Sequence, residues 1–185
     1  MYMENKQPFL FNENIIFNLC FRSNDDIDLI LCYESISGEF GCISCPSFGI
    51  EHKGNLEEYP FVQYQGFVQY QGDWIQSDNP NIEQIEAASL SHIKTAYICM
   101  LNYYTNIEGE LFDFSQINGE LRIVCKTTDE KDAIAFKIKN SLEGQVYLCC
   151  TICRENNRLY FGEDHKVLSL EEAVKEIPGF NTIFN

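Results

Sequence analysis

Apolar residues alternate with other residues across 120–153, and this alternation constrains the fold more than any other feature of the sequence. A period of two places every second side chain on the same face of a β-strand, whereas a helix needs a period of about 3.6. Three segments show it, with the apolar faces Ile123 and Cys125; Ile134, Phe136 and Ile138; and Val146, Leu148, Cys150 and Ile152. The polar breaks at 129–131 and 141–144 predict tight turns between them. The region therefore predicts a three-stranded antiparallel meander.

Further strands are expected along the rest of the chain. Residues 95–104 are apolar on both faces, as in the central strand of a sheet. Shorter apolar runs predict strands near 15–21, 28–33, 61–71 and 158–161. Residues 81–90 fit either a helix or a strand. The sequence thus predicts a mainly β fold, a two-sheet antiparallel β-sandwich over residues 14–162 within a single domain, 1–185.

One helix is expected near the C-terminal end, over residues 168–178. Ser169 is a suitable N-cap, and acidic residues in the first turn complement the positive end of the helix dipole. Pro178-Gly179 ends the helix. Its expected buried stripe is Leu170, Ala173, Val174 and Ile177. We expect this helix to lie on an edge or end of the sandwich.

The strong negative charge excludes some classes of partner. The chain has 28 acidic and 13 basic residues, which gives a net charge of −15. Phosphate backbones and anionic membranes repel such a chain, so we expect no nucleic-acid partner and no membrane insertion. Divalent cations and basic proteins remain as candidate ligands. No segment is apolar enough over the roughly 18 residues that a membrane span requires.

The cysteines predict a reducing compartment. Nine are present, and the N-terminal residues do not resemble a secretion signal, so we expect reduced thiols in the cytoplasm. Cys99, Cys125 and Cys150 share strand faces with large apolar residues and are expected to be buried. Cys42 and Cys45 lie in a segment rich in Gly, Ser and Pro and are expected to be the more reactive pair.

Two Cys-x-x-Cys pairs raise the alternative of a zinc site. They are Cys42 with Cys45 and Cys150 with Cys153. Residues three apart on a strand point to opposite faces, which favours cysteines that fill the core. The three histidines stand in unrelated contexts, and no nucleophile-elbow, P-loop or dinucleotide fingerprint occurs. We therefore expect a protein that is not an enzyme.

Acidic residues gather in two stretches that calcium would suit. The first, Asn24-Asp25-Asp26-Ile27-Asp28, separates two apolar runs, and the second covers residues 72–83. Calcium takes about six to eight oxygen ligands from carboxylates, amides and carbonyls. If the two stretches converge at one end of the sandwich, the candidate ligands are Asp26, Asp28, Asp73, Asp78, Asn79, Asn81 and Glu83. The alternative is that these are solvated turn residues.

The order of these segments resembles the TerD-like family of tellurium-resistance and general-stress proteins. That family has an acidic segment leading into an apolar strand, then a Gly-Asp segment that runs toward Glu and a β-branched residue. The counterparts here are Asp26-Ile27-Asp28-Leu29-Ile30, Gly72-Asp73-Trp74 and Glu83-Gln84-Ile85, followed by Phe112-Asp113-Phe114 and Asn118. The third acid of the first segment is replaced by Ile30, and the second loop lacks repeated Gly-Asp pairs.

The resemblance implies a calcium-binding β-sandwich linked to stress resistance, and we expect a non-enzymatic, cytoplasmic stress-response protein of this type with a protein partner. The alternative, motivated by the charge of −15 and the eroded ligand pattern, is an acidic interaction module that has lost metal binding and acts as an adaptor or an inhibitor of a basic partner. The tandem hexapeptide at 61–72, Phe-Val-Gln-Tyr-Gln-Gly twice, predicts a long strand or an insertion without chemistry of its own.

Overall fold

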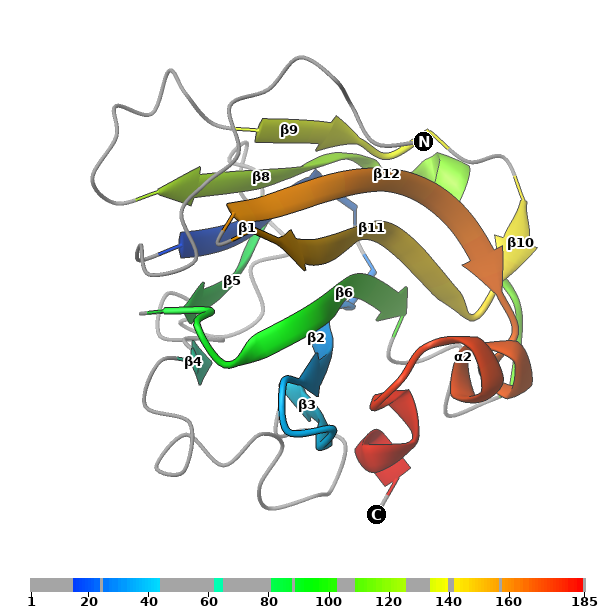
Figure 1. Cartoon of the computed structure of the whole chain (residues 1–185). Helices are drawn as coiled ribbons and strands as arrows, with labels where there is room; N and C mark the ends of the chain where they lie inside the picture. The colour runs from blue at the N-terminus through cyan, green and yellow to red at the C-terminus, as the bar shows by residue number, and fades with distance from the viewer. Residues whose placement is uncertain are drawn as a thin grey trace.

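The computed structural model describes residues 15–23, 25–43, 62–64, 81–87, 89–102, 109–125, 134–139, 142–156 and 158–184. Two five-stranded antiparallel sheets face each other (Figure 1). Sheet A has the spatial order β12 (Arg158–Leu168), β11 (Val146–Glu155), β6 (Ile93–Asn102), β2 (Ile27–Ser35) and β3 (Phe40–Ile43). Sheet B has the order β4 (Val62–Tyr64), β5 (Asn81–Ala87), β1 (Ile15–Arg22), β8 (Asn118–Cys125) and β9 (Ile134–Lys137). The predicted β-sandwich is confirmed.

Small elements complete the two sheets. A two-stranded ladder joins β7 (Phe112–Asp113) to β10 (Glu143–Gly144), and the 3₁₀ helix η2 (Phe114–Gln116) follows β7. After β12 come the helix α2 (Leu170–Glu176) and the 3₁₀ helix η4 (Phe180–Phe184). Within residues 81–90, which fit either a helix or a strand by pattern, Asn81–Ala87 form the strand β5.

The interior between the sheets is the larger of two hydrophobic clusters. Sheet B contributes every second residue of β1, namely Ile15, Phe17, Leu19 and Phe21. Sheet A contributes the matching face of β2, namely Ile27, Leu29, Leu31 and Tyr33. The alternation in β8 and β9 is as predicted, with Ile123, Cys125, Ile134 and Phe136 buried.

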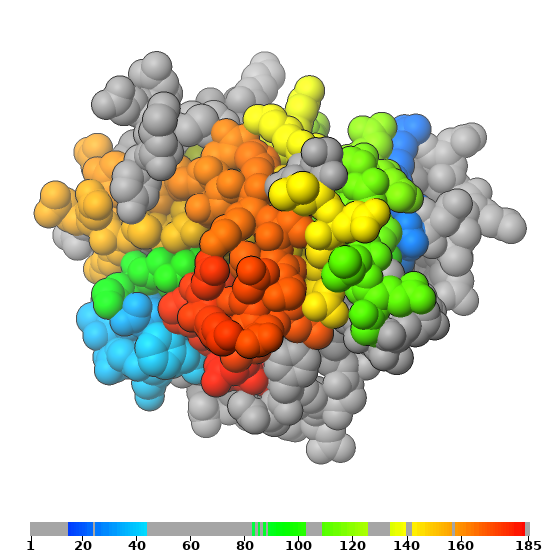
Figure 2. Space-filling view, turned by 90° about the vertical axis from the view of Figure 1, so that its right-hand side faces the viewer, coloured from blue at the N-terminus to red at the C-terminus, as the bar shows by residue number. Residues whose placement is uncertain are grey.

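The second cluster lies on the other side of sheet A, under the C-terminal segment. We call residues 169–184 the C-terminal cap and the cluster beneath it the outer core. Its members are Ile30, Cys32, Cys42, Cys99, Leu101, Val146, Leu148, Leu168, Ala173, Ile177, Phe180 and Ile183. Figure 2 shows the cap, in orange-red, against the cyan strands of the β2–β3 hairpin. Where the outer core lies, sheet A is therefore buried on both faces.

The C-terminal helix begins where the sequence predicts. The Ser169 side chain accepts a hydrogen bond from the backbone N–H of Glu172, and the Glu172 side chain accepts one from the N–H of Ser169. This reciprocal capping box fixes the first turn. Two details differ from the prediction: the helix ends at Glu176, and Val174 is 43% exposed instead of buried. Ala173 and Ile177 face the outer core, so the buried stripe is narrower than predicted.

The predicted meander is wrong in its third strand. Strands β8 and β9 pair as expected, but β9 is an edge of sheet B, and β11 lies in sheet A between β12 and β6. The chain crosses between the sheets through β10, which pairs with β7 instead of forming a tight turn. A polar break cannot distinguish a hairpin turn from such a crossing, because both need solvated backbone.

The predicted face of β11 is also wrong. The register with β6 and β12 shifts between Leu148 and Cys150, so Cys149 forms a bulge. Val146 and Leu148 point into the outer core, whereas Cys150 and Ile152 point into the interior. A bulge inserts one residue and reverses the alternation beyond it. The four apolar residues thus divide between the two clusters.

Candidate functional site

The register of β1 brings the end of the second acidic stretch, at Asn81, to the end of the sandwich that holds the first stretch. Phe21, next to the last residue of β1, pairs with Asn81, the first residue of β5. The chain therefore enters β5 at the end where it turns from β1 into β2. The Ser23 hydroxyl orders this turn, because it donates a 2.6 Å hydrogen bond to Asp25 Oδ2 and accepts one from the Asp25 N–H at 3.1 Å.

Two carboxylates near this end are buried, each with 1% exposure: Asp28 and Glu83. Asp28 is the second residue of β2 and pairs with Leu101, so it lies on the face that carries the outer core. Glu83 pairs with Leu19 and lies on the face of β5 that carries Ile85, which points to the interior. A carboxylate at such depth needs hydrogen bonds or a counter-charge to remain ionised.

A buried amide side chain, that of Asn102, lies at the same end of the sandwich as Glu83. Asn102, at the end of β6, is 1% exposed and pairs with Ile27, so it continues the interior face of sheet A. Sequence reasoning missed Asn102. The signal for it was a polar residue at the end of an apolar central strand. Oxygen-bearing side chains from β5 and β6 thus enter the interior at the end that holds the β1–β2 turn.

The structure describes the remaining predicted ligands only in part. Asp26 is half-buried in the turn. Asp73, Asp78 and Asn79 lie outside the described residues, and Asn81 is described by its backbone alone. Within the described ranges, no three His, Cys, Asp or Glu side chains are grouped so as to hold a metal ion. The seven-residue ligand set therefore stays a prediction.

A second polar cluster ties the edges of the two sheets together. The Tyr147 hydroxyl lies 2.5 Å from His165 Nδ1 and accepts a 3.2 Å hydrogen bond from the Lys139 N–H, just beyond β9. His165 Nε2 contacts the Glu163 carboxylate, which also accepts a 2.8 Å hydrogen bond from Lys139 Nζ. A neutral imidazole fits these partners if Nε2–H donates to Glu163 and Nδ1 accepts the Tyr147 proton.

The electrostatics and burial of this cluster indicate a structural role. The hydrogen bond from Lys139, followed by that from His165, lowers the pKa of Glu163. His165 has a φ of 50°, which a residue without glycine's freedom rarely adopts, and it lies in the bulge opposite Cys149. Because Tyr147 is fully buried, its hydroxyl is not presented to a substrate. No sequence signal identified this cluster, since a bulge creates it.

The cysteines follow the burial prediction with one correction. Cys99, Cys125 and Cys150 are buried as predicted, and burial raises the pKa of the Cys99 and Cys150 thiols. Cys150 faces the interior, while Cys153 lies three residues on and pairs with Thr95 on the opposite face, so these two do not share a zinc site. Cys42 was predicted to belong to the more reactive pair, but it is buried in β3 at 2% exposure because the cap covers it. Cys45 lies outside the described residues.

Two comparisons with known proteins find no relative. No family model matches this chain. A search of curated proteins finds no match either. In the described part of the chain, no helix is both long and apolar enough to cross a membrane.

Proposed function

We propose that this protein is a non-enzymatic, cytoplasmic stress-response protein of TerD-like type that binds calcium at the end of the sandwich that holds the β1–β2 turn. One observation carries the proposal: Asn81 pairs with Phe21, so the chain leaves the second acidic stretch and enters β5 at the end of the sandwich that holds the first stretch. The sandwich itself supports the TerD-like type, and the thiols of the described cysteines support the reducing compartment.

The geometry divides the seven candidate ligands. Asp28 lies on the face of sheet A that carries the outer core, whereas Glu83 points into the interior between the sheets. A single ion therefore does not take both as ligands. Glu83 points into the interior and suits the site, together with Asn81, Asp26 of the turn and the acids of residues 72–80. Carboxylate and amide oxygens are the hard ligands that calcium prefers. In this proposal Asp28 is not a ligand. The bound ion offsets its negative charge from a longer distance.

The test is thermal unfolding of the protein with millimolar calcium against EDTA. An ion that binds only the folded state stabilises it by RT ln(1 + [L]/Kd), or about 2.7 kcal/mol at a hundredfold excess over Kd. We expect a higher Tm with calcium, a large loss of that shift in Glu83→Gln and a smaller loss in Asp28→Asn. Glu155→Gln is the matched control, because exposed Glu155 lies at the opposite end of the sandwich, in the β11–β12 turn. An unchanged Tm removes calcium from the proposal.

The net charge of −15 favours a second candidate, an acidic module that binds a basic protein. Attraction between exposed charges is screened beyond about 8–10 Å at physiological salt, so this partner should be lost as salt rises. Pull-downs at low and high salt, each with and without calcium, separate the candidates. A salt-sensitive, calcium-independent basic partner supports the second candidate, and calcium-dependent capture supports the first.

A further inference from the structure

Two cysteine sulfurs lie close together in the outer core. Cys32 of β2 and Cys42 of β3 are direct partners in the antiparallel register, and their Sγ atoms are 3.5 Å apart. Opposed residues of antiparallel strands have Cα atoms about 4.5 or 5.5 Å apart, and both values fall within the range that disulfides span. Bond formation therefore requires rotation of the two side chains and no rearrangement of the strands.

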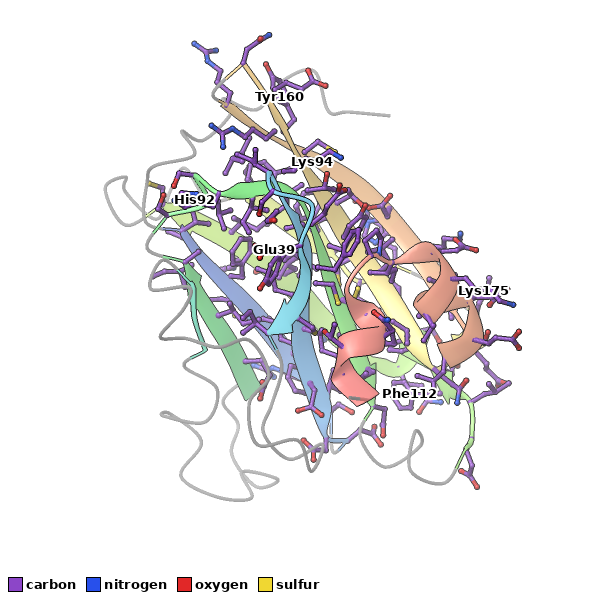
Figure 3. All side chains as sticks on the ribbon, turned by 60° about the horizontal axis from the view of Figure 1, so that its bottom comes forward. Glu39, His92, Lys94, Phe112, Tyr160 and Lys175 are labelled. Atoms are coloured by element: carbon purple, nitrogen blue, oxygen red, sulfur yellow. The ribbon has the colours of Figure 1, made fainter. Side chains whose placement is uncertain are left out.

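The pair is shielded by the C-terminal cap. Phe180 and Ile183 of η4 belong to the same buried cluster as the two cysteines. η4 lies directly against β3 (Figures 1 and 3), where Figure 3 labels Glu39 on the adjoining hairpin. Burial raises the pKa of the Cys32 thiol well above its usual value, with a further contribution from its hydrogen bond with Cys42. In the closed protein both thiols are therefore slow to react.

The contact between cap and strand depends on one glycine. Gly179 has a φ of 87°, and a Cβ there would lie 2.3 Å from the Gly41 carbonyl oxygen, in β3 beside Cys42. The cap thus rests on the backbone of the strand that carries one of the two thiols. Its displacement would uncover that strand, which the sheet order places at the edge of sheet A.

We propose that Cys32 and Cys42 form a peroxide-sensitive dithiol, which becomes a disulfide when the C-terminal cap lifts from β3. The Cys42 thiol gives up its proton, and the thiolate attacks one peroxide oxygen and breaks the O–O bond; the hydroxide that leaves takes up that proton, which gives a sulfenic acid and one water. Cys32 Sγ then attacks the Cys42 sulfur, forms the S–S bond and releases a second water. Two thiols lose two electrons to the peroxide, and a small thiol reverses the reaction. This site is independent of the proposed calcium site.

The first experiment maps the disulfide in the native protein treated with hydrogen peroxide. Glu34 and Glu39 lie between the two cysteines, so cleavage after glutamate leaves them in separate peptides that only a disulfide holds together. We expect mass spectrometry to find Cys32 bonded to Cys42, with no bond in Cys42→Ser and an unaltered bond in Cys45→Ser. A bond between Cys42 and Cys45, a bond that joins Cys99 to Cys149, or no bond at all overturns the proposal.

The second experiment tests the cap. In Gly179→Ala the added Cβ pushes the cap off β3, and we expect disulfide formation about tenfold faster because the reaction follows the open population. Gly109→Ala is the matched control, since Gly109 has a φ of 74° but no atom within 4 Å of the added Cβ. Equal rates in the two variants overturn the gating.

A milder variant covers the case in which Gly179→Ala does not fold. The Thr182 hydroxyl donates a 2.7 Å hydrogen bond to the Gly179 carbonyl oxygen, and Thr182→Val removes it at nearly constant shape. Disulfide formation in this variant should exceed the wild-type rate. A rate equal to that of the wild type would contradict the proposal, just as equal rates in Gly179→Ala and Gly109→Ala would.

Discussion

The two sheets of this sandwich are buried in different ways. In the described part of sheet B one face is buried, and β1 and β9 show the simple alternation of buried and more exposed residues. Sheet A is covered by sheet B on one side and by the C-terminal cap on the other, so β2 is buried along almost its whole length. The comparison teaches that one chain contains strands buried on one face and strands buried on both faces. The short C-terminal cap makes burial on both faces possible.

The most severe test of this comparison is a matched pair of isoleucines. Ile30 lies on the capped face of sheet A and is fully buried, whereas Ile16 lies on the uncapped face of sheet B and is half-buried. We expect Ile30→Ala to lower the free energy of unfolding by about 2–5 kcal/mol, because it leaves a cavity in the outer core. Ile16→Ala should cost about 1 kcal/mol or less. Urea unfolding measures both, and equal costs would show that the cap does not make a second core.

The same difference explains how far sequence reasoning reached. In sheet B the alternation gave the right faces, since Ile123 and Phe136 are buried and Arg122 is exposed. In β11 both faces are apolar, so neither the bulge at Cys149 nor the change of face for Cys150 leaves a trace in the pattern. The N-cap at Ser169 was readable because it depends on a local pattern, a Ser followed by acidic residues in the first turn.

The candidate site was predictable only in part. The acidic stretches were visible, and the pairing of Phe21 with Asn81 joins their ends, but it arises from the sheet order and not from any local pattern. Asp28 points toward the outer core and Glu83 toward the interior. These directions follow from strand registers in two different sheets. The pairing of Cys32 with Cys42 was likewise hidden, because spacing along the chain pointed to Cys45 instead.

A smaller effect is expected where the two sheets are tied at one edge. Tyr147→Phe removes the hydroxyl that contacts His165 and accepts a hydrogen bond from the Lys139 N–H, which should cost about 0.5–1.5 kcal/mol. Tyr160→Phe is the control, because Tyr160 is only half-buried and Figure 3 shows it at the far end of the strands. It should change stability by about 0.5 kcal/mol or less. Equal effects in denaturant unfolding would contradict the tie between the sheets.

The smallest effect concerns the exposed end of that cluster. Because the pKa of Glu163 is lowered in the folded protein, its contribution is present above the pKa of the unfolded chain and is lost as pH falls through the folded value. Glu163→Gln should therefore cost about 0.2–1 kcal/mol at neutral pH and nothing in strong acid. Unfolding free energies of both proteins across this range provide the check. A difference that persists in acid would assign the effect to shape instead of charge.

Terbium luminescence tests the central claim, that the two acidic stretches form one cation site, most directly. Terbium replaces calcium in oxygen-ligand sites and emits when a nearby indole transfers energy to it. The single tryptophan, Trp74, belongs to the second stretch, whereas Asp26 belongs to the first. We predict saturable emission on indole excitation that calcium competes away and that falls in Asp26→Asn as well as in Glu83→Gln. Emission that is absent, or unaffected by Asp26→Asn, would contradict the claim.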